Sequence, residues 1–467
     1  MGKSSLLALS IALLSTIFGS ILGFLLYKTD SLFRPFFKIA LLIPLLISPY
    51  ILAVAWKDFF FSFFQSSQLL SSYLGVILVL VSIYTPLSML IIGSALSNIN
   101  ASLEDSALII SKPRIVILKI IFPLIKPALS SSLILVFIFS ISEFSVPAFF
   151  GVKVFTTEIF TQFSAFYNHS LAILQSALLV IICIVLLLSE RKYISNAPFL
   201  SIGGKGVKTK IYHLGNRKKA SLGFLSFWVF ISILLPFIVL IMQSFIDGDN
   251  KIYQAFNLLA PTFYHSFSLA FIAAIFIVFI GFIAAYQAEI RQKKSLDWLL
   301  LFVFAIPSTI IGISFIKFYN QPWLNFIYSS YAIIIIAYVA KFSFIASKLI
   351  ANAIKQIPKS LDEAAQIQGA SFYSRIKKVL IPLIIPTLFA AFILGFIFSL
   401  GELGCTIMLY PPGTELMPIK VFTIMANAPQ SLTSSMTLIV FSLNLIFIIA
   451  LYFIMKSFLK NHSHVNN

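Results

Sequence analysis

Long apolar stretches recur along the whole of this 467-residue chain. A helix that crosses the hydrocarbon core of a bilayer needs about 20 apolar residues. Apolar residues make up 60% of the chain and charged residues 10%, whereas soluble domains have about 25% charged residues. Soluble, disordered and fibrous chains are therefore excluded, and an all-α polytopic membrane protein is predicted. Its eleven expected spans are 5–27, 38–56, 69–97, 128–149, 170–189, 221–246, 264–286, 298–317, 329–351, 383–403 and 432–456.

The distribution of Lys and Arg indicates how these spans are oriented. If the N-terminus lies outside and the C-terminus in the cytoplasm, the cytoplasmic segments carry 26 of the 33 Lys and Arg residues. The outer segments then carry six, and Lys341 lies inside a span. Cytoplasmic loops of membrane proteins are rich in Lys and Arg, so this orientation is favoured. The net charge of +18 is explained in the same way, and no nucleic-acid partner is predicted.

No residue pattern typical of catalysis or metal binding is found. Cys183 and Cys405 lie far apart, the five histidines do not cluster, and no metal-ligand spacing is present. The glycine-rich run at 203–206 lacks the G-x-x-x-x-G-K-[ST] spacing of a phosphate loop. A charge inside a span is costly, and for Lys341 a structural role is expected, through a carboxylate partner or by reaching the membrane interface. The chain is therefore not expected to be an enzyme or to bind a cofactor or metal.

A sequence repeat relates the two halves of the chain. The run FIFS at 137–140 recurs at 396–399, an offset of 259 residues. Five spans in each copy, with one additional span at 221–246, make the copies parallel repeats about a pseudo-twofold axis along the membrane normal. The first span has a counterpart in this repeat and no A-x-A-like cleavage site, so it is expected to remain in the protein. The other pairs at this offset are Tyr27 with Tyr286, Pro123 with Pro382, Pro127 with Pro386, and Glu143 with Glu402.

The repeat divides the chain into four predicted parts. Residues 1–189 form the first repeat of five spans, and residues 264–467 form the second. Residues 190–220 carry eight basic residues and the single acid Glu190, which predicts a solvated cytoplasmic linker. Residues 221–263 supply the connecting span and an outer loop.

A polar loop in the second repeat predicts a short helix on the cytoplasmic face. Ser360 and Glu363 have the spacing of a capping box, which starts a helix. Ala364 and Ala365 keep one side of that helix slim, and Gly369 supplies a left-handed turn at its end. A surface of small residues can fit a groove on a partner protein.

The corresponding loop of the first repeat has a related pattern. Ser102 and Asp105 repeat the capping-box spacing, and one residue fewer separates this loop from the next span. Two related cytoplasmic helices predict two related docking sites. The residues of this first copy are Glu104, Asp105, Ser106, Ala107 and Ser111.

These loops resemble the EAA loop of ABC importer permeases. The resemblance rests on Glu363, Ala364, Ala365, Gly369 and the VLIP run at 379–382, and it covers essentially the whole chain as two fused permease domains. It implies the fold of a type I importer permease, in which the loops dock on a separate ATPase and pass its motion to the spans. In the first loop, Asp105, Ser106 and Ser111 replace the usual residues, which puts the strength of coupling there in doubt.

Other runs are similar to the ferric iron permeases. They are SLGELGCT at 399–406, PPG at 411–413, and Ser48, Pro49 and Tyr50 with Ala53, Ala55 and Trp56. Fused permeases for thiamine, phosphonates and other solutes share much of this pattern, so these cargoes stay open as alternatives. The first half also has five spans where a half of this family commonly has six.

Two acidic residues at matching places near the outer ends of spans are candidates for the solute pathway. Glu143 and Glu402 could both face the axis between the repeats, where carboxylates attract a cation. The alternative is that both bond to backbone groups or water at the interface between the repeats.

The sequence thus predicts the permease subunit of an importer in the bacterial inner membrane, with ferric iron as the expected cargo. The resemblance implies two copies of an ATP-binding subunit and an extracytoplasmic solute-binding protein as partners, with the bilayer as the surroundings. A secondary transporter driven by an ion gradient also fits parallel repeats, but it does not need duplicated docking helices. A membrane-embedded enzyme or scaffold is a further alternative, and no catalytic cluster supports it.

Overall fold

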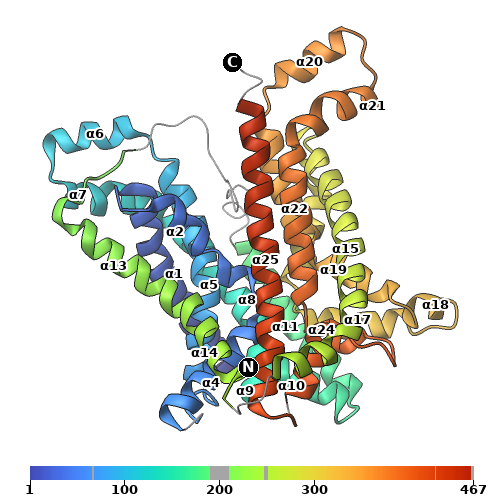
Figure 1. Cartoon of the computed structure of the whole chain (residues 1–467). Coiled ribbons are helices and arrows are strands. Elements are labelled where there is room, and N and C mark those ends of the chain that lie inside the picture. Colours follow the sequence, from blue (N-terminus) through green and yellow to red (C-terminus); the bar gives the residue numbers. More distant parts are fainter. Residues whose placement is uncertain (66–67, 190–209, 247–250, 426, 464–467) are drawn as a thin grey trace. The chain divides into compact units, whose positions relative to one another are not determined.

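The computed structural model describes residues 1–65, 68–189, 210–246, 251–425 and 427–463 (Figure 1). This described chain is helical, and its β pairing is one isolated bridge between Thr29 and Tyr212. The chain divides into two compact units. Unit 1 comprises Met1–Leu258, Ala305–Ile310 and Val421–Phe441, and unit 2 comprises Leu259–Phe304, Ile311–Lys420 and Ser442–Asn467. The repeat boundaries at 189, 220 and 263 stay predictions, because units defined by contacts need not follow sequence similarity.

The first half of the described chain contains fifteen helical elements. They are α1 (Gly2–Lys28), α2 (Arg34–Ala40), α3 (Ile43–Leu46), α4 (Pro49–Phe64), α5 (Tyr73–Ser97), α6 (Ala101–Ile110), α7 (Pro113–Val116), η1 (Ile117–Ile121), α8 (Phe122–Ser142), α9 (Ser145–Phe150), α10 (Phe155–Ser164), α11 (His169–Ser189), η2 (Gly215–Arg217), α13 (Lys218–Val229) and η3 (Phe230–Leu234).

The second half continues with further helices. They are α14 (Leu235–Ser244), α15 (Lys251–Glu289), α16 (Ser295–Ala305), α17 (Ser308–Tyr319), α18 (Asn325–Tyr328), α19 (Ala332–Lys355), α20 (Lys359–Ile367), α21 (Phe372–Arg375), η4 (Ile376–Leu380), α22 (Ile381–Gly401), α23 (Thr406–Leu409), α24 (Met417–Ile424) and α25 (Gln430–Ser463).

The number of membrane spans agrees with the prediction. Nine described helices are long and apolar enough to cross a bilayer, and the number rises to eleven if each of two sharply bent helix pairs counts as one span. The stretches at 38–56 and 298–317, predicted as plain spans, are these bent pairs. The stretch predicted at 128–149 ends earlier as a helix, at Ser142, and α9 follows as a separate short helix.

Prolines account for the two bends. The pair formed by 34–46 and α4 bends by 94°, and the pair formed by α16 and α17 bends by 105°. Pro49 is the first residue of α4, and Ser48 before it is extended, with φ −61° and ψ 133°. A proline disfavours the helical region for the preceding residue, so the helix breaks there. Pro307 occupies the gap between α16 and α17 in the same way.

Prolines also explain the π-helical turns of the described chain. η1, η3 and η4 each end two residues before a proline, which is Pro123, Pro236 or Pro382. A proline cannot donate to the carbonyl four residues back, and its ring clashes with that carbonyl. A wider turn relieves the clash within a continuous helix. η1 and η4 differ by 259 residues, so the sequence repeat is also a repeat of backbone conformation.

Within unit 1, α1, α5 and α8 pack against one another. The close approach of α1 to α5 depends on Gly19, because a Cβ at that position would lie 2.4 Å from Ser88 Cβ and 2.8 Å from the backbone N of Met89. Helices in membranes commonly meet at small residues, which let the two backbones come close. An apolar cluster at one end of this bundle joins α5 to η1 and α8 through Ile92, Leu96, Ile99, Ile121 and Ile125.

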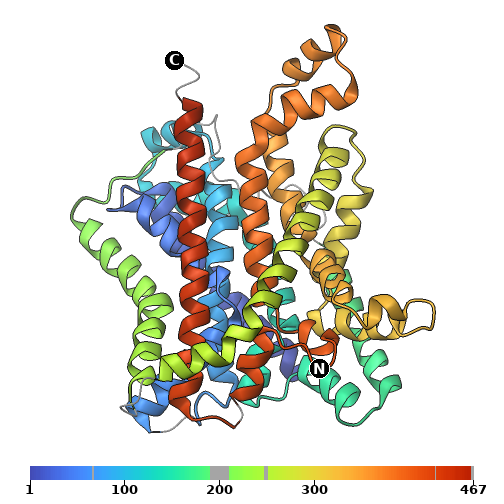
Figure 2. The same ribbon diagram turned by 45° about the vertical axis from the view of Figure 1, so that its right-hand side comes forward.

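Within unit 2, α19 and α22 run side by side (Figures 1 and 2). Gly281 of α15 makes a contact with α19 of the same kind, since a Cβ there would lie 2.7 Å from Ala346 Cβ. The short helices α20 and α21 extend beyond the ends of α19 and α22 (Figure 1).

Candidate coupling surfaces

The polar loop of the first repeat forms a helix, as predicted, but it begins differently. α6 runs from Ala101 to Ile110, and its N-cap is Asn100, whose side chain accepts a hydrogen bond from Ser102 N at 3.1 Å. The capping box predicted for Ser102 and Asp105 is therefore wrong, because Ser102 already lies inside the first turn. The capping box predicted for Ser360 and Glu363 is wrong as well. α20 starts at Lys359 after Pro358, which has no side chain that could accept a hydrogen bond.

The acidic residues of α6 point in different directions. Glu104 is completely buried, whereas the Asp105 side chain is 51% exposed and pairs with Lys210 at 2.5 Å. Ser106 is exposed and bonds to the carbonyl of Ser102. Asp105 and Ser106 are therefore accessible to a partner, and Glu104 is not.

Ala107 and Ser111 are half-buried, and a hydrogen bond between their backbones closes the end of the same helix. The backbone N–H of Ser111 donates to Ala107 O at 2.9 Å, and Ser111 is extended. The chain leaves this helix without the left-handed residue that closes α20.

Glu104 is held by the end of α1 and by residues 210–218, which lie in the described part of the linker predicted at 190–220. One carboxylate oxygen forms an ion pair with Lys28, the last residue of α1, which is also completely buried. The other accepts a hydrogen bond from the Tyr212 hydroxyl at 2.8 Å. Burial, the hydrogen bond to Glu104 and the Glu104 charge together raise the pKa of Tyr212, so its hydroxyl stays a donor. A buried charge needs such partners, because removal from water is costly.

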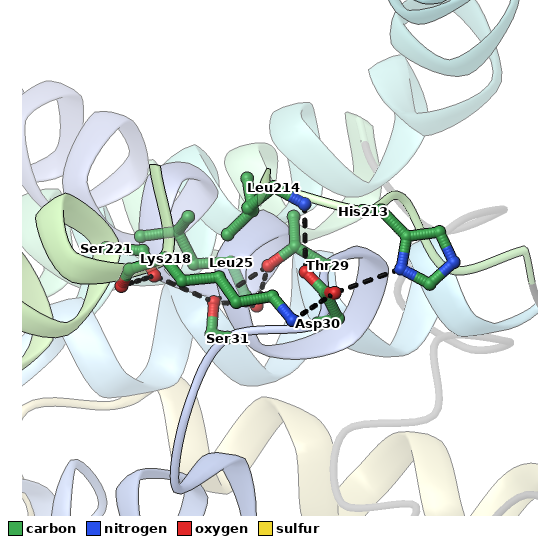
Figure 3. Close-up of polar contacts among 8 residues, drawn as sticks. All are labelled: Leu25, Thr29, Asp30, Ser31, His213, Leu214, Lys218 and Ser221. Carbon is green, nitrogen blue, oxygen red and sulfur yellow. Dashed lines mark hydrogen bonds and ion pairs between the residues drawn. The ribbon is translucent and has the colours of Figure 1, made fainter. Parts of the chain in front are cut away.

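Asp30 ties the same segment to the end of α1 (Figure 3). Its carboxylate accepts hydrogen bonds from Leu214 N at 2.9 Å and from His213 Nδ1 at 3.0 Å, and it pairs with Lys218 Nζ at 2.7 Å. The Lys218 ammonium, the Leu214 N–H and His213 together hold the pKa of Asp30 well below its usual range. The backbone of Tyr212 adds two bonds, from its N–H to Lys28 O at 2.7 Å and from Asp30 N–H to its O at 3.2 Å.

In the polar loop of the second repeat, the predicted residues lie mostly on the surface. Glu363 and Ala364 of α20 are exposed, and Ala365 is half-buried. Gly369 has a φ of +77°, and Ala370 N–H donates to Ala365 O at 3.0 Å, which is the left-handed helix end predicted from the sequence. The side chains of Asp362 and Gln366 both contact Arg375 at 3.1 Å, which links α20 to α21.

Glu143 and Glu402 occupy equivalent positions at helix ends. Each follows the last residue of its helix, α8 or α22, in an extended conformation, and each is half-buried. Glu143 Oε1 accepts from Ser145 N at 2.9 Å, and Glu402 Oε1 accepts from Cys405 N at 3.2 Å. Both carboxylates therefore stabilise the start of the next short helix, as a side-chain oxygen does at an N-cap. Tyr84 OH also donates to Glu143 Oε2, at 3.4 Å.

Lys341 has the structural position that was expected for it, and a backbone carbonyl is one of its partners. Its Nζ donates to Phe304 O at 3.2 Å. Phe304 lies in the last turn of α16, immediately before the 105° bend. A cation is favourable at the C-terminal end of a helix, where carbonyls lack partners within the helix.

The structural contacts of Lys28, Tyr212 and Asp30 were not predicted from the sequence. Lys28 directly follows Tyr27, a position recognised in the repeat, and its counterpart in the second copy is the uncharged Gln287. That difference is a signal that the sequence contained. Tyr212 had no signal, because its contacts depend on how the end of the predicted linker packs against α1 and α6. Of the linker predicted at 190–220, residues 190–209 with the glycine-rich run lie outside the described residues.

Equivalent buried hydroxyls in the two copies were also missed. Tyr50 and Thr309 are each the second residue of the helix after a bend, and their hydroxyls are buried without a hydrogen-bond partner. The hydroxyls of Ser140 and Ser399, three residues before Glu143 and Glu402, are likewise buried without a hydrogen-bond partner. Within the described residues, no group of three His, Cys, Asp or Glu side chains could hold a metal ion.

Comparison with known proteins relates both halves to one family. The model of the binding-protein-dependent transport system inner membrane component matches residues 15–195 and again residues 277–460. A Fe(3+)-transport system permease protein, FbpB 2 of Haemophilus influenzae, is 26% identical over 91% of this chain and 84% of its own length.

Two further relatives extend this comparison. The ferric transport system permease protein FbpB of Actinobacillus pleuropneumoniae is 25% identical over 87% of this chain and 64% of its own length. A Salmonella typhimurium protein named for 2-aminoethylphosphonate transport is 26% identical over 41% of this chain and 73% of its own length. The two family matches together cover more than half of the chain, with one match in each predicted repeat. The chain therefore belongs to the family of binding-protein-dependent transport system inner membrane components, of which it carries two copies.

Proposed function

We propose that this chain is the membrane-spanning subunit of an ATP-driven importer, and that it couples to a separate ATPase through α6 and α20. The observation that carries the proposal is the recurrence of a short polar helix at the same place in both family-matched segments. Asp105 of α6 and Glu363 of α20 are the exposed carboxylates of these helices. ATP binds and is hydrolysed on the partner, with one copy under each docking helix, and this chain holds no cofactor.

Counting spans supports one side of the membrane for both docking helices. If each bent helix pair counts as one span, α6 follows the third span and α20 follows the ninth, so that six crossings lie between them. The excess of Lys and Arg in the same set of loops assigns this side to the cytoplasm. The N-terminus then lies outside and the C-terminus inside.

Ferric iron is the cargo that the relatives favour. Two of them that cover most of this chain are named for Fe(3+) or ferric transport. A binding protein outside the membrane delivers the solute. Glu143 and Glu402 are the candidate carboxylates for the pathway, because they are half-buried acids at equivalent helix breaks. Their backbone contacts each use one oxygen, so the carboxylates can cap a helix and still carry negative charge near the solute.

Co-purification tests the coupling. The tagged chain is purified from its host in mild detergent, beside a variant with Asp105→Arg and Glu363→Arg. The control is Glu415→Arg, which reverses an equally exposed carboxylate (55% exposed) outside the docking helices. An ATPase is expected with the wild type and the control and not with the double variant. A folded wild-type chain that brings no ATPase contradicts the proposal and favours a transporter driven by an ion gradient.

Uptake measurements test the cargo. Cells that express the chain together with its ATPase and its binding protein are given radioactive ferric iron, with excess unlabelled iron, 2-aminoethylphosphonate or thiamine as competitor. Only unlabelled iron is expected to compete. Competition by 2-aminoethylphosphonate instead assigns the organic solute and overturns the assignment to iron, while the permease function stands.

A further inference from the structure

We propose that the two docking helices differ in how they are attached: α6 is locked to α1 through Glu104, whereas the described side-chain bonds of α20 run to Arg375 of its own hairpin with α21. The segment at 210–218 completes the lock on α6. Glu104, Lys28 and Tyr212 are then positioning residues, which act through α6 and do not touch a partner. The term docking helix rests on the proposed function, but the difference in attachment does not.

Three sets of contacts fix α6 in unit 1. Glu104 bonds to Lys28 and to Tyr212, with both charged groups fully buried. Tyr212 in turn packs against the apolar cluster of α5, η1 and α8, and its backbone bonds to Lys28 O and Asp30 N. On the surface, Lys210 pairs with Asp105. A movement of α6 relative to α1 therefore has to break a buried ion pair.

Among the described residues, the buried ion pair of this lock has no counterpart at the aligned positions of the second copy. The residue aligned with Glu104 in the loop is Asp362, whose side chain is 46% exposed and pairs with Arg375 thirteen residues away. Gln287 stands where the first copy has Lys28, so an uncharged amide replaces the cation of the first lock. In the described part of unit 2, the side-chain bonds of α20 stay within 359–375.

The burial of these contacts determines how stiff each attachment is. An exposed ion pair contributes little and reforms readily in water. A buried pair cannot separate without leaving an uncompensated charge in a poorly solvated place. α6 should therefore follow α1 as one body, and α20 should open locally at low cost.

Amide hydrogen exchange of the purified chain in lipid nanodiscs tests the difference without any ATPase. In the wild type, peptides from α6 are expected to exchange at least about tenfold more slowly than peptides from α20. Glu104→Gln should accelerate exchange in α6 and leave α20 unchanged. The control Glu415→Gln, which breaks an exposed pair elsewhere, should change neither helix.

Tyr212→Phe gives a milder second variant in case Glu104→Gln does not fold. It removes one hydroxyl and should accelerate α6 to a smaller extent. The exchanged pair Lys28→Glu with Glu104→Lys should restore slow exchange, which a loss of general stability does not explain. Equal exchange of α6 and α20 in the wild type, or no response of α6 to both Glu104→Gln and Tyr212→Phe, overturns the proposal.

A functional measurement separates this inference from the proposed coupling. In the assembled transporter, Glu104→Gln should raise the ATP hydrolysed per solute imported, while the amount of bound ATPase stays constant. If ATPase binding is lost in the Asp105→Arg, Glu363→Arg variant and retained in Glu104→Gln, the proposed coupling is supported independently of the exchange rates. If α6 exchanges slowly in a chain that binds no ATPase, the attachment of α6 to α1 stands and the docking role of α6 is wrong.

Discussion

Lys341 of α19 donates a hydrogen bond to the carbonyl of Phe304 at 3.2 Å and so places a cation at the broken end of α16. The break itself follows from Pro307, but the proline does not supply a donor for the carbonyls that it leaves behind. A side chain from another helix of unit 2 supplies it.

We expect Lys341→Met to destabilise the protein by about 1–2 kcal/mol, because a cation at a partly buried helix end contributes about that much. The methionine keeps the length of the side chain and removes the charge and the donor. Lys341→Arg, which keeps both, should retain most of the stability. The measurement is the midpoint of unfolding in a fixed detergent, and a variant as stable as the wild type contradicts the assignment.

The helix-capping role of Glu143 and Glu402 makes a separate prediction. Glu143→Ala and Glu402→Ala should each cost about 1 kcal/mol, the usual value for removing a cap. Glu143→Gln and Glu402→Gln keep an oxygen that accepts the same hydrogen bond, so both should fold with nearly wild-type stability. If the carboxylates also act on a cationic solute, the two Gln variants lose several-fold in iron uptake. If both Gln variants take up iron at the wild-type rate, Glu143 and Glu402 act only as helix caps.

The Asp30 contacts predict how stability depends on pH. Because its pKa in the folded protein lies below the ordinary value of about 3.9, the folded state favours the ionised carboxylate. This stabilisation is fully present above the ordinary pKa and is lost as the pH falls towards the lowered one. Asp30→Asn should therefore unfold at a lower temperature than the wild type at pH 7, with a gap that narrows below about pH 4. A gap that is constant from pH 7 to pH 3 rules out the charge as its cause.

The buried pair of Lys28 and Glu104 predicts a large effect for one partner and a smaller one for both. Lys28→Met leaves Glu104 buried without its cation, which should cost about 3–5 kcal/mol. Lys28→Met with Glu104→Leu removes both charges and should recover much of that loss. Comparison of the unfolding midpoints of the two single variants and the double variant measures the coupling. Additive losses in the double variant contradict the pairing.

The contact between α1 and α5 predicts the consequence of enlarging Gly19. Its missing Cβ leaves room for Ser88 and for the backbone of Met89, and backbone atoms cannot rotate out of the way. Gly19→Val should therefore force the helices apart and cost at least about 2 kcal/mol, in the range of overpacked cores. Gly223→Val of α13, where a Cβ meets nothing within 4 Å, is the matched control. Equal stability of the two variants contradicts the close approach.

The sequence alone determined the membrane class, the eleven spans, the repeat and the two short polar helices. Each of these depends on local pattern: apolar length, the 259-residue offset, and a glycine such as Gly369 that favours a left-handed turn. Helix starts were predicted less well, because Ser102 and Asn100 can both cap, and geometry decides which one does. Pro49 and Pro307 are local signals for the two bends, but the angles of 94° and 105° were beyond the local pattern.

Only the tertiary structure decided which acids are buried and which are exposed. Glu104 and Asp105 are neighbours in sequence and both acidic, yet one is buried against Lys28 and Tyr212 and the other reaches the surface. Their difference depends on residues 76 and 108 positions away from Glu104, and no local pattern encodes such contacts. A charge can be buried only where distant parts of the chain supply its partners, so its role becomes visible when the chain has folded.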